Sequence, residues 1–551
     1  MQVHPETLAE PWWKRGVFYN LYPCSYQDGD GDGWGDIAGI RSRLDHLVRL
    51  GVDGVWLTPI YVSPMKDFGY DVADHTAIGP LFGTLAEFDA LVAEAHARGL
   101  RLVLDFVANH TSDRHPWFLE SRASRDNPRA DWYVWRDPAP DGGPPNNWRS
   151  LFGGSAWSWC AERGQYWYHA FLAEQPDLNW RNPAVAAAQH EVMRFWLARG
   201  VDGFRVDAMW HLLKDPAWRD NPPNPDFLPG EPAIREFLQI RTADLPETVE
   251  VVRGLRKVVD EFPDRVLIGE LYLDFERICA YYGEALDGCH LPFNLHLMMD
   301  PWRADVVAGM IRTYEAALPK GAWPNWVLGN LDNPRVASRF GPGQARVAAM
   351  FLLTTRGTPF LWQGDEIGMT NGVVPPERIR DPQEKQEPGL VDHNRDIART
   401  PMQWDTSPGA GFSTGEPWLP LAPDHATCNV EAEESDPNSI LWLHRRLTAL
   451  RRAHPALAIG EVTVLGGEDG VLTHVRSHGA ERFVVALNFS HEPRVVSIAE
   501  AVGGRVALAT GLDRDGETVG GTLHLGPDEG VVISLIGADR HDAESRDTVV
   551  P

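Results

Sequence analysis

The sequence predicts an α/β fold, a (β/α)8 (TIM) barrel with an inserted subdomain after the third strand and a C-terminal antiparallel β-sandwich. Three observations support this prediction. Short β-rich runs alternate with helical patterns through the first four-fifths of the 551 residues. A stretch rich in Trp, Pro, Asn and Gly interrupts the alternation after the third run. Beyond about residue 461 the hydrophobic period becomes two, as in antiparallel strands.

Eight β-rich runs are expected to form the barrel. In chain order they are GVFYNLYP (16–23), VDGVWLTP (52–59), LRLVLDFVANH (100–110), VDGFRVDA (201–208), RVLIGELY (265–272), GCHLPFNLHL (288–297), NWVLGNLDN (325–333) and TPFLWQGDEIG (358–368). In a barrel of eight such units the catalytic residues sit where strands end and loops begin.

Two of the helices between these runs can be placed by their ends. Thr84 and Glu87 form a capping box for a helix with one apolar face, and a glycine ends the pattern at residue 99. Asn182, followed by proline, opens a second helix that a glycine closes at residue 200. In both cases the next β-rich run follows at once.

The chain divides into three expected domains. Residues 1–110 and 179–460 form the barrel (domain A), residues 111–178 the inserted subdomain (domain B), and residues 461–551 the C-terminal β-sandwich (domain C). In domain C the runs VLTHVRS, RFVVALNFS, RVVSI, LHLG and VVISL are the expected strands. The polar tail ADRHDAESRDTVVP is expected to be frayed.

The composition excludes several classes of partner. Fifty-one Lys and Arg against 77 Asp and Glu give a net charge of −26, which argues against nucleic acid and anionic lipid. The N-terminus lacks the apolar core of a secretory signal, and no segment approaches the roughly 20 apolar residues of a membrane helix. We therefore expect a cytoplasmic protein with a neutral or cationic ligand. The five cysteines show no CxxC spacing, so neither a disulfide framework nor a zinc site is indicated.

Polar residues at the ends of the predicted strands converge on one rim. Three of them, Asp207, Glu270 and Asp332, are carboxylates from different strands that face one cleft. A satisfied ion-pair network is the structural alternative, and Arg205 could support it. Crowded like charges push protonation states apart, which favours catalysis for the set as a whole.

A carboxylate and a carboxylic acid side by side suit the cleavage of a glycosidic bond. Arg205 would keep Asp207 ionised, so Asp207 is the candidate nucleophile. Glu270 emerges from the apolar run VLIG, where desolvation would raise its pKa and keep a proton available for the departing oxygen. Asp332 would orient ring hydroxyls and stabilise the transition state.

At these positions the chain resembles a known family. DFVANH, GFRVDA, IGEL and GNLDNPR are similar to the four short motifs of the α-amylase superfamily, glycoside hydrolase family 13, in order and spacing. QPDLN (175–179) and RTPMQWD (399–405) resemble its oligo-1,6-glucosidase and α-glucosidase branch. The resemblance implies a retaining α-glucosidase that works by double displacement through a covalent glucosyl-enzyme.

The resemblance also implies roles for individual residues. Asp207 matches the nucleophile, Glu270 the acid/base and Asp332 the transition-state stabiliser. The substrate-binding positions that it implies are Asp67, Tyr70, His110, Phe152, Phe171, Arg205, Ala208, Leu331 and Arg399. Phe152 and Phe171 would be aromatic walls, and Ala208, next to the nucleophile, would bear on linkage preference.

Leu331 departs from the family pattern. The family usually has His immediately before the stabilising Asp, where it donates a hydrogen bond to a glucose hydroxyl. Leucine cannot donate, and the loss should cost on the order of 1–3 kcal/mol of transition-state binding. We expect slower hydrolysis, with acceptor preference shifted from water toward sugars or alcohols.

The run DGDGDGWGD (28–36) is a candidate metal loop. Acidic side chains at alternate positions would repel one another unless a cation joined them. The resemblance implies a structural Ca2+ site, with Mg2+ as the other candidate, whose side-chain ligands are Asp28, Asp30, Asp32 and Asp36, with the carbonyl of Trp34. The alternative is a solvated acidic turn.

Two other functions remain open from the sequence. A transglucosylase or glucoside isomerase would use the same triad, and Leu331 favours it. A non-catalytic relative, such as the ectodomain of amino-acid transporter heavy chains, would need a membrane anchor and a broken triad, and the sequence shows neither. The sequence leaves open linkage preference, aglycone preference and oligomeric state.

Overall fold

The computed structural model describes residues 4–388 and 394–535, so the predicted polar tail lies outside the described residues. Within these ranges, eight parallel strands form the central sheet: β1 (Phe18–Leu21), β2 (Gly54–Leu57), β5 (Arg101–Phe106), β9 (Gly203–Val206), β10 (Val266–Gly269), β11 (Leu291–Pro292), β12 (Asn325–Val327) and β13 (Thr358–Trp362). Their order is β11-β10-β9-β5-β2-β1-β13-β12, a nearly closed barrel. Each strand lies inside one of the eight predicted runs, which confirms the barrel.

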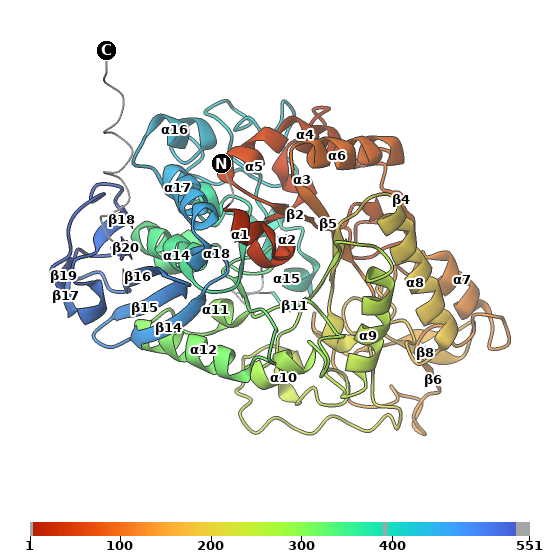
Figure 1. Cartoon of the computed structure of the whole chain (residues 1–551). Helices are drawn as coiled ribbons and strands as arrows, with labels where there is room; N and C mark the ends of the chain where they lie inside the picture. Colours follow the sequence, from red (N-terminus) through yellow and green to blue (C-terminus); the bar gives the residue numbers. More distant parts are fainter. Residues whose placement is uncertain (1–3, 389–393, 536–551) are drawn as a thin grey trace, which may run out of the picture.

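Helices surround these strands (Figure 1). The predicted capping box is present: the Thr84 hydroxyl accepts from the backbone of Glu87, and Glu87 accepts from the backbone of Thr84. It opens α6 (Leu85–Ala97), whose apolar face is buried. Asn182 caps α8 (Pro183–Ala198) by accepting from the Ala184 amide.

A small sheet lies between β5 and β9 in the sequence. After α7 (Pro116–Ala123), strands β6 (Trp135–Arg136), β8 (Gln165–Tyr168) and β7 (Trp157–Cys160) pair antiparallel in that spatial order. They pack around a separate aromatic cluster that includes Trp148, Trp157 and Tyr168. A second small pair, β3 (Tyr61–Val62) and β4 (Asp74–Ile78), follows β2.

The C-terminal part consists of antiparallel sheets, as predicted. The larger sheet has the order β14-β15-β16-β20-β18, and β17 pairs with β19. The bounds are β14 (Glu461–Gly466), β15 (Val471–His478), β16 (Glu481–Asn488), β17 (Arg494–Ser497), β18 (Arg505–Ala509), β19 (Thr522–Leu525) and β20 (Gly530–Ser534). Side chains of both sheets share one apolar cluster. The sequence pattern did not predict β14 and β18. In Figure 1 these sheets lie on the opposite side of the barrel from β6 and β8.

Two buried arginines meet at the C-terminal end of one barrel helix, and one of them comes from the C-terminal sheets. Arg451, on α17 (Ile440–Ala453), donates to the carbonyls of Leu353 and Thr355 at the end of α14 (Pro342–Thr354). Arg476, on β15, donates to the carbonyl of Thr354. A cation beside the last carbonyls of a helix is stabilised by the helix dipole and satisfies acceptors that the helix leaves unpaired. The barrel and the sheets are therefore joined through the C-terminal end of α14.

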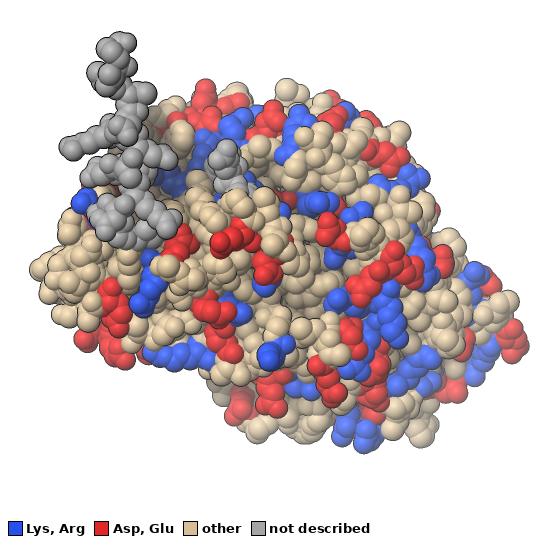
Figure 2. Space-filling view, in the orientation of Figure 1, with Lys and Arg blue, Asp and Glu red and all other residues tan. Residues whose placement is uncertain are grey.

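Acidic and basic side chains are interspersed on the molecular face shown in Figure 2. None of the helices in residues 4–388 and 394–535 is long and apolar enough to cross a membrane. All five cysteines lie in these ranges, and each is a free thiol.

Candidate active site

The three predicted carboxylates lie at one end of the barrel. Asp207 directly follows β9, Glu270 directly follows β10, and Asp332 lies in the loop after β12. The carboxyl ends of parallel strands meet at the same rim, which brings the three residues together. All three line one cavity of about 650 Å³.

Arg205 connects the proposed nucleophile to the proposed acid/base. Its Nη1 atom lies 2.7 Å from Asp207 Oδ1 and its Nη2 atom lies 2.7 Å from Glu270 Oε1. Nη1 also bonds Asp105 Oδ1 at 2.9 Å. These bonds form the ion-pair network that the sequence allowed. Arg205 and Asp105 are fully buried, so the network lies behind the carboxylates that line the cavity.

The protonation of this group differs from our expectation for Asp207. Burial raises the pKa of Glu270, as predicted. Burial also raises the pKa of Asp207 well above its usual range, although Arg205 opposes this shift. The reason is that one guanidinium is shared by three carboxylates, which repel one another. Each of the two catalytic carboxyls therefore holds its proton more firmly than a carboxyl in water does, and the charge of one affects the titration of the other.

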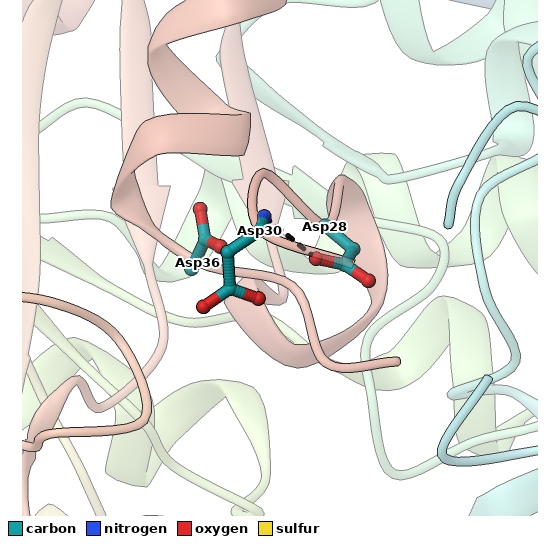
Figure 3. A group of neighbouring side chains, drawn as sticks. All are labelled: Asp28, Asp30 and Asp36. Atoms are coloured by element: carbon teal, nitrogen blue, oxygen red, sulfur yellow. Dashed lines mark hydrogen bonds between the residues drawn. The ribbon is translucent and has the colours of Figure 1, made fainter. Parts of the chain in front are cut away.

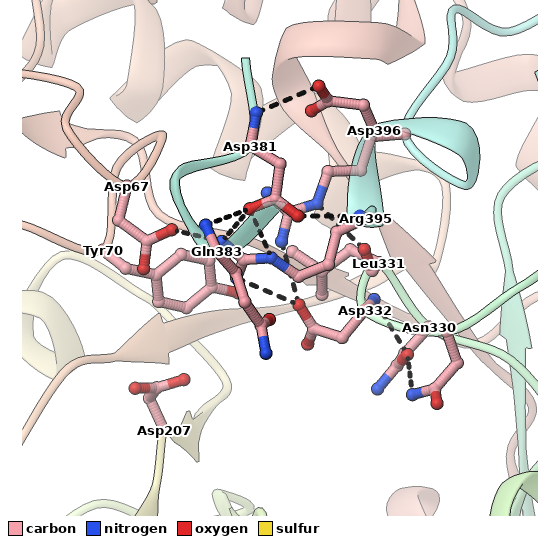
Figure 4. Close-up of polar contacts among 12 residues, drawn as sticks. Asp67, Tyr70, Asp207, Asn330, Leu331, Asp332, Asp381, Gln383, Arg395 and Asp396 are labelled. Carbon is pink, nitrogen blue, oxygen red and sulfur yellow. Dashed lines mark hydrogen bonds and ion pairs between the residues drawn. The ribbon is translucent and has the colours of Figure 1, made fainter. Parts of the chain in front are cut away.

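Asp332 is held from behind by Arg399. Arg399 Nη2 lies 2.9 Å from Asp332 Oδ1, and its Nε donates to the Leu331 carbonyl at 2.9 Å. Both Arg399 and the Leu331 side chain are fully buried and neither lines the cavity. The Asn330 side chain accepts from the Asp332 amide at 3.0 Å (Figure 4). The loop is thus fixed on both sides of Asp332.

Arg395 lines the cavity but was not predicted from the sequence. It pairs with Asp67 Oδ1 at 2.8 Å and with Asp381 Oδ1 at 2.7 Å, and it lies 3.5 Å from Asp332 Oδ1 (Figure 4). Its guanidinium also stacks over the Phe152 ring at 4.8 Å. The available signal was a second arginine four positions before Arg399, in the sequence RDIAR.

The closed end of the cavity is polar. Asp67 and Tyr70 lie in the loop between β3 and β4, and His110 follows β5. Gln175 Nε2 is 3.1 Å from both Asp67 Oδ2 and His110 Nε2. Burial lowers the pKa of His110 to about 4, so the imidazole is neutral at pH 7. The Tyr70 hydroxyl donates to Asp105 at 3.0 Å.

Of the nine predicted substrate-binding residues, all within the described part of the chain, Asp67, Tyr70, His110, Phe152 and Phe171 line the cavity. The four others, Arg205, Ala208, Leu331 and Arg399, are buried behind it. Ala208 adopts a left-handed conformation (φ 44°) and donates its amide to Glu270 Oε2 at 2.9 Å. It therefore contacts the acid/base rather than the cavity. Cavity residues that were not predicted include Gln175, Trp210, His211, Ile240, Tyr272 and Gln383.

Three of the four predicted acidic ligands converge in the loop after β1 (Figure 3). One carboxylate oxygen each of Asp28, Asp30 and Asp36 lies within 4.8 Å of the others. Asp32 is exposed and outside this group, with Oδ1 accepting from the Trp34 amide at 2.8 Å. Burial raises the pKa of Asp36, and the neighbouring Asp30 and Asp28 add to the effect. Hard carboxylate oxygens at this spacing fit Ca2+ or Mg2+.

Comparison with known proteins gives the family. The model of the α-amylase catalytic domain matches residues 20–460. The chain belongs to the α-amylase family. A probable α-glucosidase of Rhizobium meliloti (strain 1021) is 43% identical over 512 residues, covering 89% of this chain and 92% of that protein. An oligo-1,6-glucosidase of Parageobacillus thermoglucosidasius is 38% identical, covering 90% and 93%.

Solved structures of this family are also similar to the chain. An α-glucosyl transfer enzyme, XgtA, superposes with a TM-score of 0.90 at 38% identity, covering 95% of this chain and 99% of that one. The trehalulose synthase MutB gives a TM-score of 0.88 at 34% identity, covering 96% and 100%. The recognition of the α-amylase family from the motifs is confirmed, and the protein is a glycoside hydrolase.

Proposed function

We propose that the protein is an exo-acting, retaining α-glucosidase that removes terminal glucose from short α-glucosides. The observation that carries this proposal is the Arg205 guanidinium, which bonds both Asp207 and Glu270 at 2.7 Å. Because both carboxylates bond the same guanidinium, they lie side by side at the cavity. This arrangement is compatible with direct displacement, for which retaining enzymes keep the two groups about 5–5.5 Å apart. The names of the relatives support the substrate class.

The geometry supports a double displacement. Asp207 attacks the anomeric carbon while Glu270 gives its proton to the departing oxygen, which leaves glucose esterified to Asp207. Glu270, now ionised, takes a proton from water as the water oxygen attacks the same carbon and the ester bond breaks. Asp332, anchored by Arg399, faces the cavity and is placed to stabilise the positive charge on the ring.

An exo mode of action fits the closed end of the cavity. Asp67, Tyr70 and His110 are less than a tenth exposed and block the far side of the glucose position. Gln175 ties Asp67 to His110 across this end. A chain of sugars could leave this pocket in only one direction, so a terminal residue is the expected substrate.

Asp207→Asn is the direct test. The variant should lose at least about 10³-fold in kcat, because it keeps the size of the side chain and lacks the nucleophile. Product from the wild-type enzyme should appear first as the α-anomer of glucose, measured by NMR on maltose, isomaltose, sucrose and an aryl α-glucoside. Release of β-glucose would overturn the retaining mechanism. If Asp207→Asn kept wild-type activity, Asp207 would not be the nucleophile, and a non-catalytic role for this chain would have to be considered again.

Transglucosylation or glucoside isomerisation is the second candidate. The absent donor at Leu331 favours it, and the similar structures include an α-glucosyl transfer enzyme and a trehalulose synthase. The two candidates are separated by the ratio of free glucose to transfer products on maltose and on sucrose. Glucose as the main product supports hydrolysis, whereas isomers or oligosaccharides as the main products support transfer.

We also propose that the loop after β1 holds a structural Ca2+, with Mg2+ as the competing ion. Asp28, Asp30 and Asp36 would supply carboxylate oxygens, and the ion would relieve their repulsion. Their place in the loop, away from the residues that line the cavity, supports a role in stability. The cytoplasmic location remains a prediction from the sequence.

A further inference from the structure

One wall of the cavity is apolar and opens to solvent. Trp210, Ile240 and Ala243 come from the segment between β9 and α9 (Thr248–Val259), Leu273 follows β10, and Leu151 comes from the loop before β7. The exposed fraction of the cavity residues rises from 3% at Asp67 to 51% at Ile240. Trp210 and Ala243 are buried, Leu151 and Leu273 are partly exposed, and Ile240 is the most exposed member of the wall. The outer part of the apolar wall is therefore at the mouth, where the group that departs from glucose must lie.

Two polar residues of this wall are already bonded within the protein. Gln239 donates from Nε2 to the carbonyls of Ile234 and Phe237, and its Oε1 accepts from the Thr242 hydroxyl at 2.8 Å. Asp244 accepts from Arg277 at 2.7 and 2.9 Å and from the Tyr281 hydroxyl at 2.9 Å.

Two further polar side chains face this part of the cavity. His211 is bonded through Nδ1 to the Thr242 carbonyl at 3.2 Å, and burial lowers its pKa to about 3, so the ring is uncharged. Gln383, on α15 (Pro382–Gln386), extends toward Asp332 from the opposite side (Figure 4). The wall itself therefore offers carbon surface and few hydrogen-bonding groups.

A second sugar and an apolar group would fare differently against this wall. The hydroxyls of a sugar would give up water without finding partners on Ile240, Ala243 and Leu273, which is unfavourable. An alkyl or aryl group would remove the same carbon surface from water, which is favourable.

We infer that the mouth of the cavity selects an apolar aglycone, so that alkyl and aryl α-glucosides are better substrates than their polar counterparts. This inference rests on the proposed α-glucosidase function and names the substrate class of the same site. Ile240 is the specificity-determining residue at the outer edge.

Alkyl α-glucosides of increasing length test the inference, because their leaving alcohols are chemically alike. Full burial of one methylene is worth about a four-fold gain, and a half-open wall should give about two-fold. We therefore expect kcat/KM to rise about five- to ten-fold from methyl to butyl α-glucoside. A butyl to methyl ratio of one or below would overturn the inference.

Ile240→Ser assigns the effect to this wall. The side chain is half exposed, so the variant should fold, and the butyl to methyl ratio of kcat/KM should fall about three-fold. The ratio cancels any effect of the substitution that is common to both glucosides. Val502→Ser, at a residue 63% exposed on the C-terminal part, is the matched control and should leave the ratio unaltered. Equal ratios in wild type and Ile240→Ser would exclude Ile240 as the determinant.

Failure of the proposed function would give a different result. Neither maltose nor any alkyl glucoside would then be hydrolysed. In that case, calorimetry on the Asp207→Asn variant would still measure how tightly alkyl α-glucosides bind to the cavity. Tighter binding of butyl than of methyl α-glucoside supports the apolar wall, and equal binding overturns it.

Discussion

Asp105 is a buried carboxylate that contacts both Arg205, the cation shared by the catalytic carboxyls, and Tyr70, a side chain that lines the cavity. Its carboxylate accepts from Arg205 at 2.9 Å, from the Tyr70 hydroxyl at 3.0 Å and from the Trp56 indole at 3.3 Å. It thereby positions both the shared cation and a cavity side chain. The sequence placed Asp105 at a strand end, but its three partners come from elements far apart in the chain.

Asp105→Asn should move the alkaline limb of the pH profile. Asp105 contributes to the raised pKa of Glu270, and without its charge Arg205 interacts more strongly with the remaining carboxylates. The pKa of Glu270 should fall, so the proton needed for departure of the aglycone is lost at lower pH. The alkaline limb of kcat/KM should therefore shift to lower pH, measured on methyl α-glucoside. An unshifted limb with reduced kcat would show a purely steric role.

Leu331→His should restore a donor beside Asp332. Leu331 is fully buried outside the cavity residues and its carbonyl is held by Arg399, so the full gain requires the imidazole to turn from this position toward the cavity. The expected gain of 1–3 kcal/mol corresponds to an increase in kcat/KM of about five- to 150-fold on maltose. Leu331→Met is the control and should change little. An unchanged kcat/KM in a folded Leu331→His enzyme would show that the position is idle.

At the scale of elements, Lys214 ties two chain segments together beneath the cavity. Its Nζ pairs with Asp177, donates to Asn109 Oδ1 at 2.8 Å and donates to the His211 carbonyl at 2.6 Å. Asp177 also accepts from the Ala170 amide at 2.7 Å. The segment after β8 is thus fastened to the loops that follow β5 and β9.

Lys214→Met should destabilise the protein by about 3–5 kcal/mol, because it leaves Asp177 buried without its cation. The change is measured by urea unfolding. Lys214→Met with Asp177→Asn should recover part of the loss, since the uncompensated charge is removed. Arg303→Met, which breaks an exposed pair with Asp305, is the control and should cost less than about 1 kcal/mol. Equal losses in Lys214→Met and the double variant would contradict this account.

The elements differ in how much local sequence decides them. The helix at 85–97 was predicted because its cap, apolar face and terminal glycine lie within one short stretch. The strands β14 and β18 were missed, because β14 is only half buried along its length and β18 has a register shift against β20. Their pairing depends on neighbours that are distant in sequence.

At the scale of the whole molecule, the loop after β1 joins distant parts of the chain. Asp28 Oδ2 accepts from the Ser413 hydroxyl at 2.6 Å, and the Trp418 amide donates to the Gly33 carbonyl at 2.9 Å. Gly33 has φ 93°, and a Cβ there would lie 2.0 Å from the Glu416 carbonyl oxygen, so only glycine fits. A cation in this loop would stabilise the contact between both segments.

Removal of the metal should lower the melting temperature by several degrees while the folded enzyme keeps its activity. The measurement is thermal unfolding with and without EDTA, followed by re-addition of Ca2+ or Mg2+. Asp30→Ala should abolish the response to EDTA, whereas Asp32→Ala should keep it, because the Asp32 carboxylate lies outside the three-oxygen group. A melting temperature indifferent to EDTA and to added metal would support the solvated acidic turn.

The sequence by itself determined the barrel, the family and the three carboxylates, because alternating β and helical patterns and short motifs are local properties of the chain. The tertiary structure decided which predicted residues face the substrate. It placed Arg399 and Leu331 behind Asp332, brought Arg395 into the cavity, and divided Arg205 among three carboxylates. The physical reason is that burial and charge sharing depend on side chains that meet only when distant strands and loops converge on one rim.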